Sequence, residues 1–225
     1  MPAINLSSLQ KDTLRFFAKH KFGRNFYWTG GTILAYRYLN HRNSVDLDFF
    51  SGKLFSDDKY LFFINDLKKA VKADKIILTK KYNRRLYLIK RGQENIKLEL
   101  VYFPFPQIKK REVIPEFGIK IDSIDDIITN KILSTYQRNE PKDVFDLYFY
   151  LSGRKTYDLM QLIRMAEKKF GVAIEKIILL AKINELSKNL ESLKPLILKP
   201  EKDFDKRIKT FFQDIFNKIA RKEIG

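Results

Sequence analysis

The sequence contains no cysteine, which excludes both a disulfide framework and a zinc site built from thiolates. It has no apolar run approaching the roughly 18 residues of a membrane-spanning helix. The first residues, MPAINLSSLQKD, lack the apolar core of a secretory signal peptide. These absences predict a cytoplasmic protein that does not bind a membrane.

Acidic residues are scarce relative to basic ones, with 27 Asp and Glu against 44 Lys and Arg, for a net charge of +17. A charge of this size concerns partners rather than fold, and it points to a polyanion such as RNA, DNA or a nucleotide. A genome rich in A and T would also raise the lysine content, so composition alone leaves both explanations open. The chain of 225 residues is long enough for one large domain or two small ones.

The two halves of the chain differ in pattern. Before residue 122, helical stretches occur early and strand-like stretches dominate later, and the predicted strands cover residues 25–29, 45–50, 75–80, 84–90 and 96–103. After residue 122, every periodic segment has the spacing of a helix. We therefore predict an α+β fold, with a small mixed sheet and flanking helices in domain 1–122 and an all-helical bundle in domain 123–225.

Asp46 and Asp48 are the first candidate site residues. In a strand, residues i and i+2 point to the same face, so both carboxylates project together while Val45, Leu47 and Phe49 pack behind them. Two acids this close favour a cation between them, and hard oxygen ligands suit Mg²⁺. Two solvated acids on an exposed strand are the alternative.

Gly30 and Gly31 follow the first predicted strand and precede a helical segment. A glycine pair there lets the main chain approach a phosphate closely and presents N–H groups to it. A plain strand-to-helix turn explains the pair equally well, and it matches neither the Walker pattern nor the dinucleotide fingerprint.

Glu99 is the one acid in the segment Ile96–Val101. If its strand neighbours that of Asp48, it completes a group of three carboxylates, one of which helps to activate an attacking hydroxyl in two-metal phosphoryl transfer. Otherwise it is a surface glutamate beside Lys97.

Taken in order, these features resemble the nucleotidyltransferase superfamily related to DNA polymerase β, whose signature is a glycine pair, a short helix, Asp-x-Asp and a later acid. The later acid is more often aspartate in that superfamily, so Glu99 is a departure. The resemblance narrows to the AbiEii/AbiGii toxin nucleotidyltransferases on longer stretches between residue 28 and about residue 151. These are Gly30-Gly31-Thr32-x-Leu34-Ala35, His41-Arg42-x-Ser44-x-Asp46-Leu47-Asp48-Phe49-Phe50, Asn130-Lys131, Arg138, and Lys142-Asp143-Val144-Phe145-Asp146-Leu147-Tyr148.

The resemblance implies a nucleotide site with catalytic, phosphate-binding and metal-binding residues. Mg²⁺ would be held by Asp46 and Asp48, with Glu99 as a third ligand or base. The nucleoside triphosphate would be bound by Gly30, Gly31, Thr32, Arg42, Ser44, Lys131 and Asp143. Asp146, on the same helix face as Asp143, would line the nucleotide pocket, and the helical domain would bring Lys131 and Asp146 to the cleft.

Three residues of the central string have open roles. Arg42 grips a phosphate or orients an acid such as Asp48. His41 is structural or takes part directly. Ser44 lies against the metal site, and in some relatives a hydroxyl in this region is modified by an antitoxin.

The resemblance implies transfer of a nucleoside monophosphate to an acceptor hydroxyl, with the 3′ end of tRNA as the expected acceptor and a cognate antitoxin as a further partner. A protein or small-molecule acceptor, and a module that binds a nucleotide or partner without catalysis, are the alternatives.

Overall fold

We describe the fold from a computed structural model of the chain, in residues 4–153, 156–198 and 202–224. The chain divides into two compact units, Met1–Ile124 and Asp125–Gly225. Each unit is described by itself below. Among the described residues, no helix combines the length and the apolar character that crossing a membrane requires.

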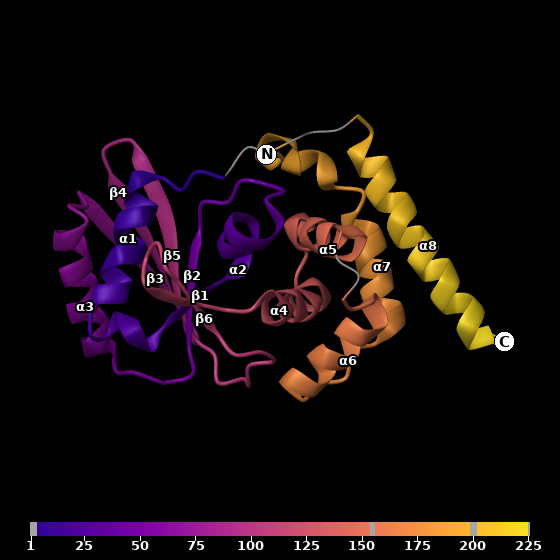
Figure 1. Ribbon diagram of the computed structural model, residues 1–225, viewed down its shortest axis with the longest axis horizontal. Helices are drawn as coiled ribbons and strands as arrows, with labels where there is room; N and C mark the ends of the chain where they lie inside the picture. Colours follow the sequence, from indigo (N-terminus) through magenta and orange to yellow (C-terminus); the bar gives the residue numbers. More distant parts are fainter. Residues whose placement is uncertain (1–3, 154–155, 199–201, 225) are drawn as a thin grey trace. The chain divides into compact units, whose positions relative to one another are not determined.

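The first unit is built on one mixed sheet (Figure 1). Its strand order is β3-β4-β5-β2-β1-β7-β6. Strand β2 runs antiparallel to β1 and parallel to β5, which confirms the predicted mixed sheet within an α+β fold. The strands are β1 (Tyr27–Thr29), β2 (Leu47–Ser51), β3 (Lys75–Lys81), β4 (Arg84–Arg91), β5 (Glu94–Tyr102), β6 (Glu112–Ile114) and β7 (Ile119–Ile121).

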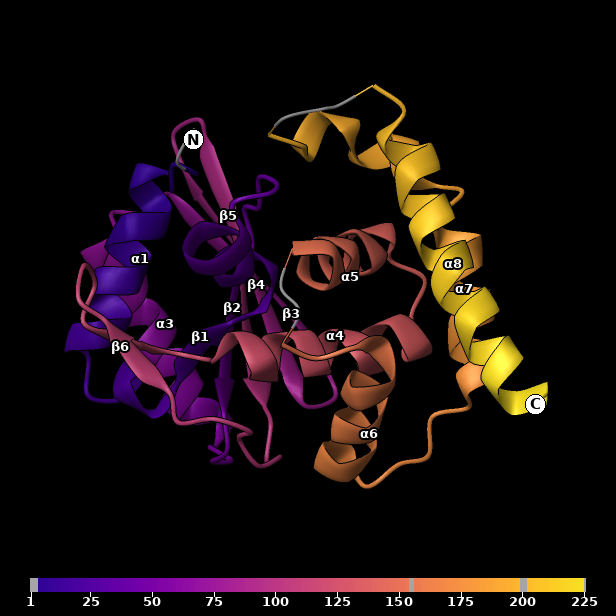
Figure 2. The same ribbon diagram turned by 45° about the vertical axis from the view of Figure 1, so that its right-hand side comes forward.

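Helices α1 (Ser8–Lys19) and α3 (Asp57–Ala70) lie together on one face of this sheet (Figures 1 and 2). The Phe17 ring of α1 stacks on Phe49 of β2 at 3.8 Å between ring centroids, and Phe63 of α3 meets Phe17 edge-on at 4.9 Å. These buried rings form the core between helices and sheet, since aromatic side chains bury the largest apolar areas. The opposite face of β2 and β5 carries the acids.

The helix after β1 begins earlier than the sequence suggested. Residues Gly30–Ile33 form α2, and Leu34–Leu39 continue it as a π-helical segment, η2. Asn40 ends the segment in the left-handed conformation with φ 49°, which asparagine tolerates better than most residues. The wider turn of η2 was not predicted, because residues 32–40 carry only an ordinary helical pattern.

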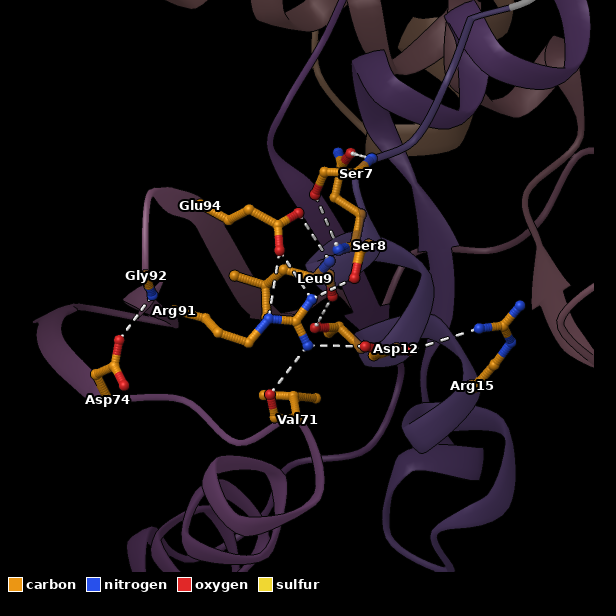
Figure 3. A network of polar contacts seen from close by, with 12 residues as sticks. Ser7, Ser8, Leu9, Asp12, Arg15, Val71, Asp74, Arg91, Gly92 and Glu94 are labelled. Atoms are coloured by element: carbon orange, nitrogen blue, oxygen red, sulfur yellow. Dashed lines mark hydrogen bonds and ion pairs between the residues drawn. The ribbon is translucent and has the colours of Figure 1, made fainter.

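Arg91 ties three elements of the first unit together (Figure 3). Its guanidinium donates to Asp12 of α1 at 2.8 Å, to Glu94 of β5 at 2.9 Å and to the Val71 carbonyl after α3 at 3.1 Å. A further bond to the Ser8 hydroxyl measures 2.6 Å. These charge-assisted bonds hold the start of α1 and the end of α3 against the β4–β5 hairpin.

The described elements of the second unit are helical. Helix α6 begins with a capping box between Asp158 and Gln161 and ends at Gly171 in the left-handed conformation, as helix ends often do. Contacts join α7 to α8 and α5 to both. The elements are α4 (Ile124–Gln137), α5 (Pro141–Gly153), α6 (Leu159–Phe170), α7 (Lys176–Leu186), the 3-10 helix η3 (Leu190–Leu196) and α8 (Phe204–Ile224).

Candidate active site

Asp48 and Glu99 lie side by side on the face of the sheet opposite α1 and α3. Strands β2 and β5 are parallel neighbours, and their register pairs Asp48 with Glu99. On each side of Asp48, Leu47 and Phe49 point into the core and are fully buried. The sequence pattern predicts Glu99 beside Asp48 only if their strands are neighbours. Strands β2 and β5 are neighbours, so this condition is met.

Asp46 precedes β2 and is half-buried. Its main-chain carbonyl accepts a hydrogen bond from the Thr32 hydroxyl. The expectation that Val45 packs behind the acids is wrong, because Val45 is 59% exposed. The regular strand begins only at Leu47, so Val45 lies in the preceding loop.

Gly30 is required where it stands. Its φ of +81° lies in the region that side chains disfavour, and an added Cβ would come within 2.0 Å of Asp48 Oδ2. The carboxylate of Asp48 therefore packs directly on the α-carbon of Gly30. This contact places the glycine turn and the acid in one site.

Arg42 packs against the second glycine. A Cβ on Gly31 would meet Arg42 Nη2 at 2.6 Å and Ser44 Oγ at 3.6 Å. Arg42 is only 2% exposed, and its Nη1 donates to the Asn43 carbonyl at 3.1 Å. The guanidinium is thus held at the glycine turn. His41, next to it, is buried.

Thr32 links the loop to the helix. It is buried, and its hydroxyl bonds to Ser44 Oγ at 2.8 Å as well as to the Asp46 carbonyl. These bonds fix the approach of the chain to Asp46 and Asp48. In this arrangement the Thr32 side chain positions the loop that leads to the acids.

Sequence reasoning missed two partners of the site. Arg84 of β4 forms an ion pair with Glu99 at 3.3 Å, so Glu99 is not simply a solvated acid beside Lys97. Asp122 is buried and accepts bonds from the Thr29 hydroxyl and from Arg111 Nε, both at 3.1 Å. Asp122 fixes the end of β1 just before the glycine turn. The one signal for it in the sequence was an acid directly after a short strand.

The donors around Asp48 suit a hard divalent cation that arrives with phosphates. Within residues 4–153, 156–198 and 202–224, no three His, Asp or Glu side chains gather closely enough to hold a metal by themselves. Mg²⁺ does not need such a cage, since one or two carboxylates with substrate phosphates and water complete its shell. Asp46, Asp48 and Glu99 supply carboxylate oxygens of the required kind.

The second unit contains a buried ion network between α4 and α5. Lys131 Nζ lies 2.5 Å from Asp143 Oδ1 and 2.8 Å from Asp146 Oδ2, and all three residues are buried. Arg138 adds two bonds to Asp143, at 2.7 and 3.1 Å. Lys142, on the same helix as these acids, lies 3.9 Å from Glu140.

This network controls the protonation of Asp143. Burial alone would raise the pKa of Asp143, but the charges of Lys131 and Arg138 and their hydrogen bonds outweigh it and hold the pKa below its usual value. Asp143 therefore stays ionised at neutral pH. A second buried pair, Lys169 with Asp126 at 2.7 Å, fastens α6 to α4 in the same unit.

Comparison with known protein families identifies the family of the chain. Residues 13–223 match the family described as nucleotidyl transferase AbiEii toxin, type IV TA (toxin–antitoxin) system. No curated protein matches the chain.

Two crystal structures from Helicobacter pylori show the same fold. The structure of JHP933 is 20% identical with a TM-score of 0.56, over 97% of this chain and 97% of that one. A second protein from that organism is 20% identical with a TM-score of 0.54, over 95% of this chain and 94% of that one. At this identity the likeness concerns the fold alone, whereas the family match spans nearly the whole sequence. The chain belongs to the family of nucleotidyl transferase AbiEii toxins of type IV toxin–antitoxin systems.

Proposed function

We propose that this protein transfers a nucleoside monophosphate from a nucleoside triphosphate to the 3′-terminal hydroxyl of a tRNA, with Mg²⁺ bound. Blocking that end would stop translation, which accounts for a toxin. The observation that carries the proposal is the surroundings of Asp48. Asp48 packs on Gly30, is paired in register with Glu99 and lies two residues from Asp46 in the sequence. The free toxin would act in the cytoplasm and be silenced by a cognate antitoxin.

In the reaction, the acceptor oxygen forms a bond to the α-phosphorus of the triphosphate. The bond from that phosphorus to the bridging oxygen breaks, and pyrophosphate leaves with the electron pair. The acceptor proton passes to Glu99, whose carboxylate lies beside Asp48, and from there to solvent. Arg84 lies 3.3 Å from the Glu99 carboxylate and forms an ion pair with it.

The chain contributes mainly position and charge. The main-chain N–H groups of Gly30 and Gly31 and the guanidinium of Arg42 bind the triphosphate. Thr32 and Ser44 fix the loop that carries Asp46. Bound between Asp46, Asp48 and the phosphates, Mg²⁺ would neutralise the negative charge that develops as pyrophosphate leaves.

The roles of the second unit follow from the family resemblance. Lys131 binds the phosphates, and Asp146 lines the nucleotide pocket with Asp143 beside it. Their mutual ion pairs fix the ammonium group in one orientation before substrate arrives. Replacing Lys131 by methionine, with folding of the variant verified by circular dichroism and nucleotide binding measured by isothermal titration calorimetry, tests this role independently of transfer.

RNA is the acceptor that the charge favours. The chain carries 17 more basic than acidic side chains, and binding to a polyanion releases its counterions. Transfer to tRNA should therefore slow steeply as salt is raised. A small-molecule acceptor would show little of this dependence.

The test is a transfer assay with total tRNA, Mg²⁺ and each of the four α-³²P-labelled nucleoside triphosphates in turn. Asp48→Asn removes a carboxylate of the site, and Asp58→Asn, on the exposed side of α3, is the matched control. Label on tRNA with wild type and Asp58→Asn, and none with Asp48→Asn, supports the proposal.

Label on a protein or on a small molecule would show that this molecule, and not tRNA, is the acceptor. Bound nucleotide with no label on any acceptor would make the protein a nucleotide-binding module and overturn the proposal.

A further inference from the structure

On the acid-bearing face of the sheet, β3, β4 and β5 are three consecutive neighbours that present alternate side chains. The antiparallel registers place these side chains in rows across three strands. The row of Glu99 continues through Leu86 to Thr79. The next two rows are Lys97, Leu88 and Ile77, then Asn95, Lys90 and Lys75. We call these residues, with Arg84, the basic sheet face.

Its three lysines are exposed, and so is Ile77, at 39%. The opposite face of the same strands is different in kind, because Tyr87, Ile89 and Leu98 are buried under α1 and α3. The basic sheet face is therefore a solvent-facing surface, and Glu99 lies in one of its rows.

The charge on this surface is one-sided. Its single acid, Glu99, is paired with Arg84. Lys75 and Lys90 are directly opposite each other in the ladder, where like charges repel. In the part of the chain that the structure describes, no carboxylate forms an ion pair with Lys75, Lys90 or Lys97. A sheet surface with unbalanced positive charge fits a polyanionic ligand.

The lysines also lie at a useful distance from the chemistry. Lys97 is two residues from Glu99 on the same strand, and the row of Lys90 lies four residues away, or roughly 7 and 14 Å along β5. The aliphatic side chains of Ile77, Leu86 and Leu88 lie among them. Such a surface accommodates phosphates at the ammonium groups and the uncharged faces of ribose and base between them.

We infer that the basic sheet face binds the strand of the acceptor RNA that leads to the reacting hydroxyl, through Lys75, Lys90, Lys97 and Arg84. This inference rests on the proposed transfer to RNA and adds where the acceptor binds. Replacing Lys75, Lys90 and Lys97 by glutamine should weaken RNA binding and leaves every residue assigned to the nucleotide site unchanged.

The test compares two triple variants with the same change in charge. Lys75→Gln, Lys90→Gln and Lys97→Gln alter the basic sheet face. Lys59→Gln, Lys68→Gln and Lys69→Gln alter three exposed lysines of α3, which covers the other face of the sheet. Binding of tRNA with a 5′ fluorophore is followed by anisotropy at several salt concentrations without nucleoside triphosphate, and thermal melting confirms that both variants fold.

We expect the sheet-face variant to bind tRNA at least tenfold more weakly at about 0.1 M salt. Its plot of log affinity against log salt should be shallower by about 2, since each lost contact to single-stranded phosphate removes about 0.7. The α3 variant should stay within about twofold of wild type. Equal losses in both variants would reduce the effect to bulk charge, and unchanged binding in the sheet-face variant would exclude the surface; either result overturns the inference.

A polyglutamate probe separates an acidic protein segment from RNA. If the sheet-face variant loses polyglutamate binding and keeps tRNA binding, the face serves a protein and the inference is wrong. Failure of the proposed function gives a different result. If wild type binds tRNA through this face but places no label on it, the inference about the face stands and the proposed transfer is wrong. If the sheet-face variant labels and binds tRNA as wild type does, the proposed transfer stands and the inference about the face is wrong.

Discussion

The carboxylate of Asp48 packs on the α-carbon of Gly30, closely enough that a methyl group there would lie 2.0 Å from Oδ2. Gly30 also has a φ of +81°. The turn expected to hold phosphates and the acid expected to hold Mg²⁺ are thus one unit of structure. A change in either residue displaces the other.

Gly30→Ala should therefore reduce both stability and activity. The left-handed backbone alone costs about 1–2 kcal/mol, and the clash with Asp48 adds to it. We expect a free energy of unfolding lower by about 2 kcal/mol or more and a nucleotide transfer rate at least tenfold lower. Denaturant unfolding and the labelling assay measure the two effects. Gly153→Ala is the control, because a Cβ there meets nothing within 4 Å, and equal behaviour of the two variants would contradict the account.

Glu99→Gln tests the acid beside Asp48. A general base contributes about 10²- to 10⁴-fold, so kcat should fall by at least about 100-fold while nucleotide binding changes little. Arg84→Gln, which removes the ion pair but keeps the carboxylate, should retain most of the activity. A Glu99→Gln enzyme with normal kcat would remove Glu99 from the reaction.

The buried network of the second unit should be costly to break. Lys131→Met removes an ion pair from each of two buried carboxylates, Asp143 and Asp146, and breaking such a pair costs about 3–5 kcal/mol. Lys142→Met, at a half-exposed lysine 3.9 Å from Glu140, should cost under about 0.5 kcal/mol. Urea unfolding of the two variants measures the difference, and similar midpoints would show that the network contributes nothing.

The same network sets an acid limit on stability. Because the pKa of Asp143 is lowered in the folded protein, its contribution is present above the unfolded pKa of about 3.9 and is lost as pH falls through the folded value. We expect the loss of stability of wild type below about pH 4 to be steeper than that of Asp143→Asn. Unfolding curves between pH 2.5 and 7 would show it, and parallel curves for the two proteins would exclude this role.

Arg91 should matter far more than its neighbour Arg15, although both contact Asp12 (Figure 3). Arg91→Met removes bonds to three elements and leaves Asp12 and Glu94 without it, for an expected cost of about 2 kcal/mol. Arg15→Met removes one exposed pair at 3.4 Å and should cost under about 0.5 kcal/mol. A melting temperature that falls equally in both variants would contradict this assignment.

The local parts of the site could be predicted from the sequence because their spacing is short. The glycine pair before a helical segment predicts the turn at Gly30, whereas Asp46 precedes β2, so the shared face that the i, i+2 spacing predicts for the two acids stays a prediction. The position of Glu99 relative to Asp48 depended on which strands become neighbours in the sheet. The register of β2 against β5 places the two residues side by side. The order of strands in the sheet could not be predicted from the sequence pattern alone.

Other features lay beyond sequence reasoning for identifiable reasons. Strand β6 has two exposed residues and one buried one, Ile114, so it shows no alternation to detect. Asp122 gains its role from Thr29, 93 residues earlier. The ion pairs of Asp143 and Asp146 with Lys131 depend on the packing of α4 against α5, which the spacing of the acids along one helix does not reveal.

The central claim is that the 3′-terminal hydroxyl of tRNA receives a nucleotide. The most direct measurement gives the enzyme α-³²P-labelled nucleoside triphosphate with intact tRNA or with tRNA whose terminal diol has been oxidised by periodate. The account predicts label on intact tRNA, none on oxidised tRNA, and none on either with Asp48→Asn. Equal label on oxidised tRNA, or label from Asp48→Asn at the wild-type rate, would contradict it.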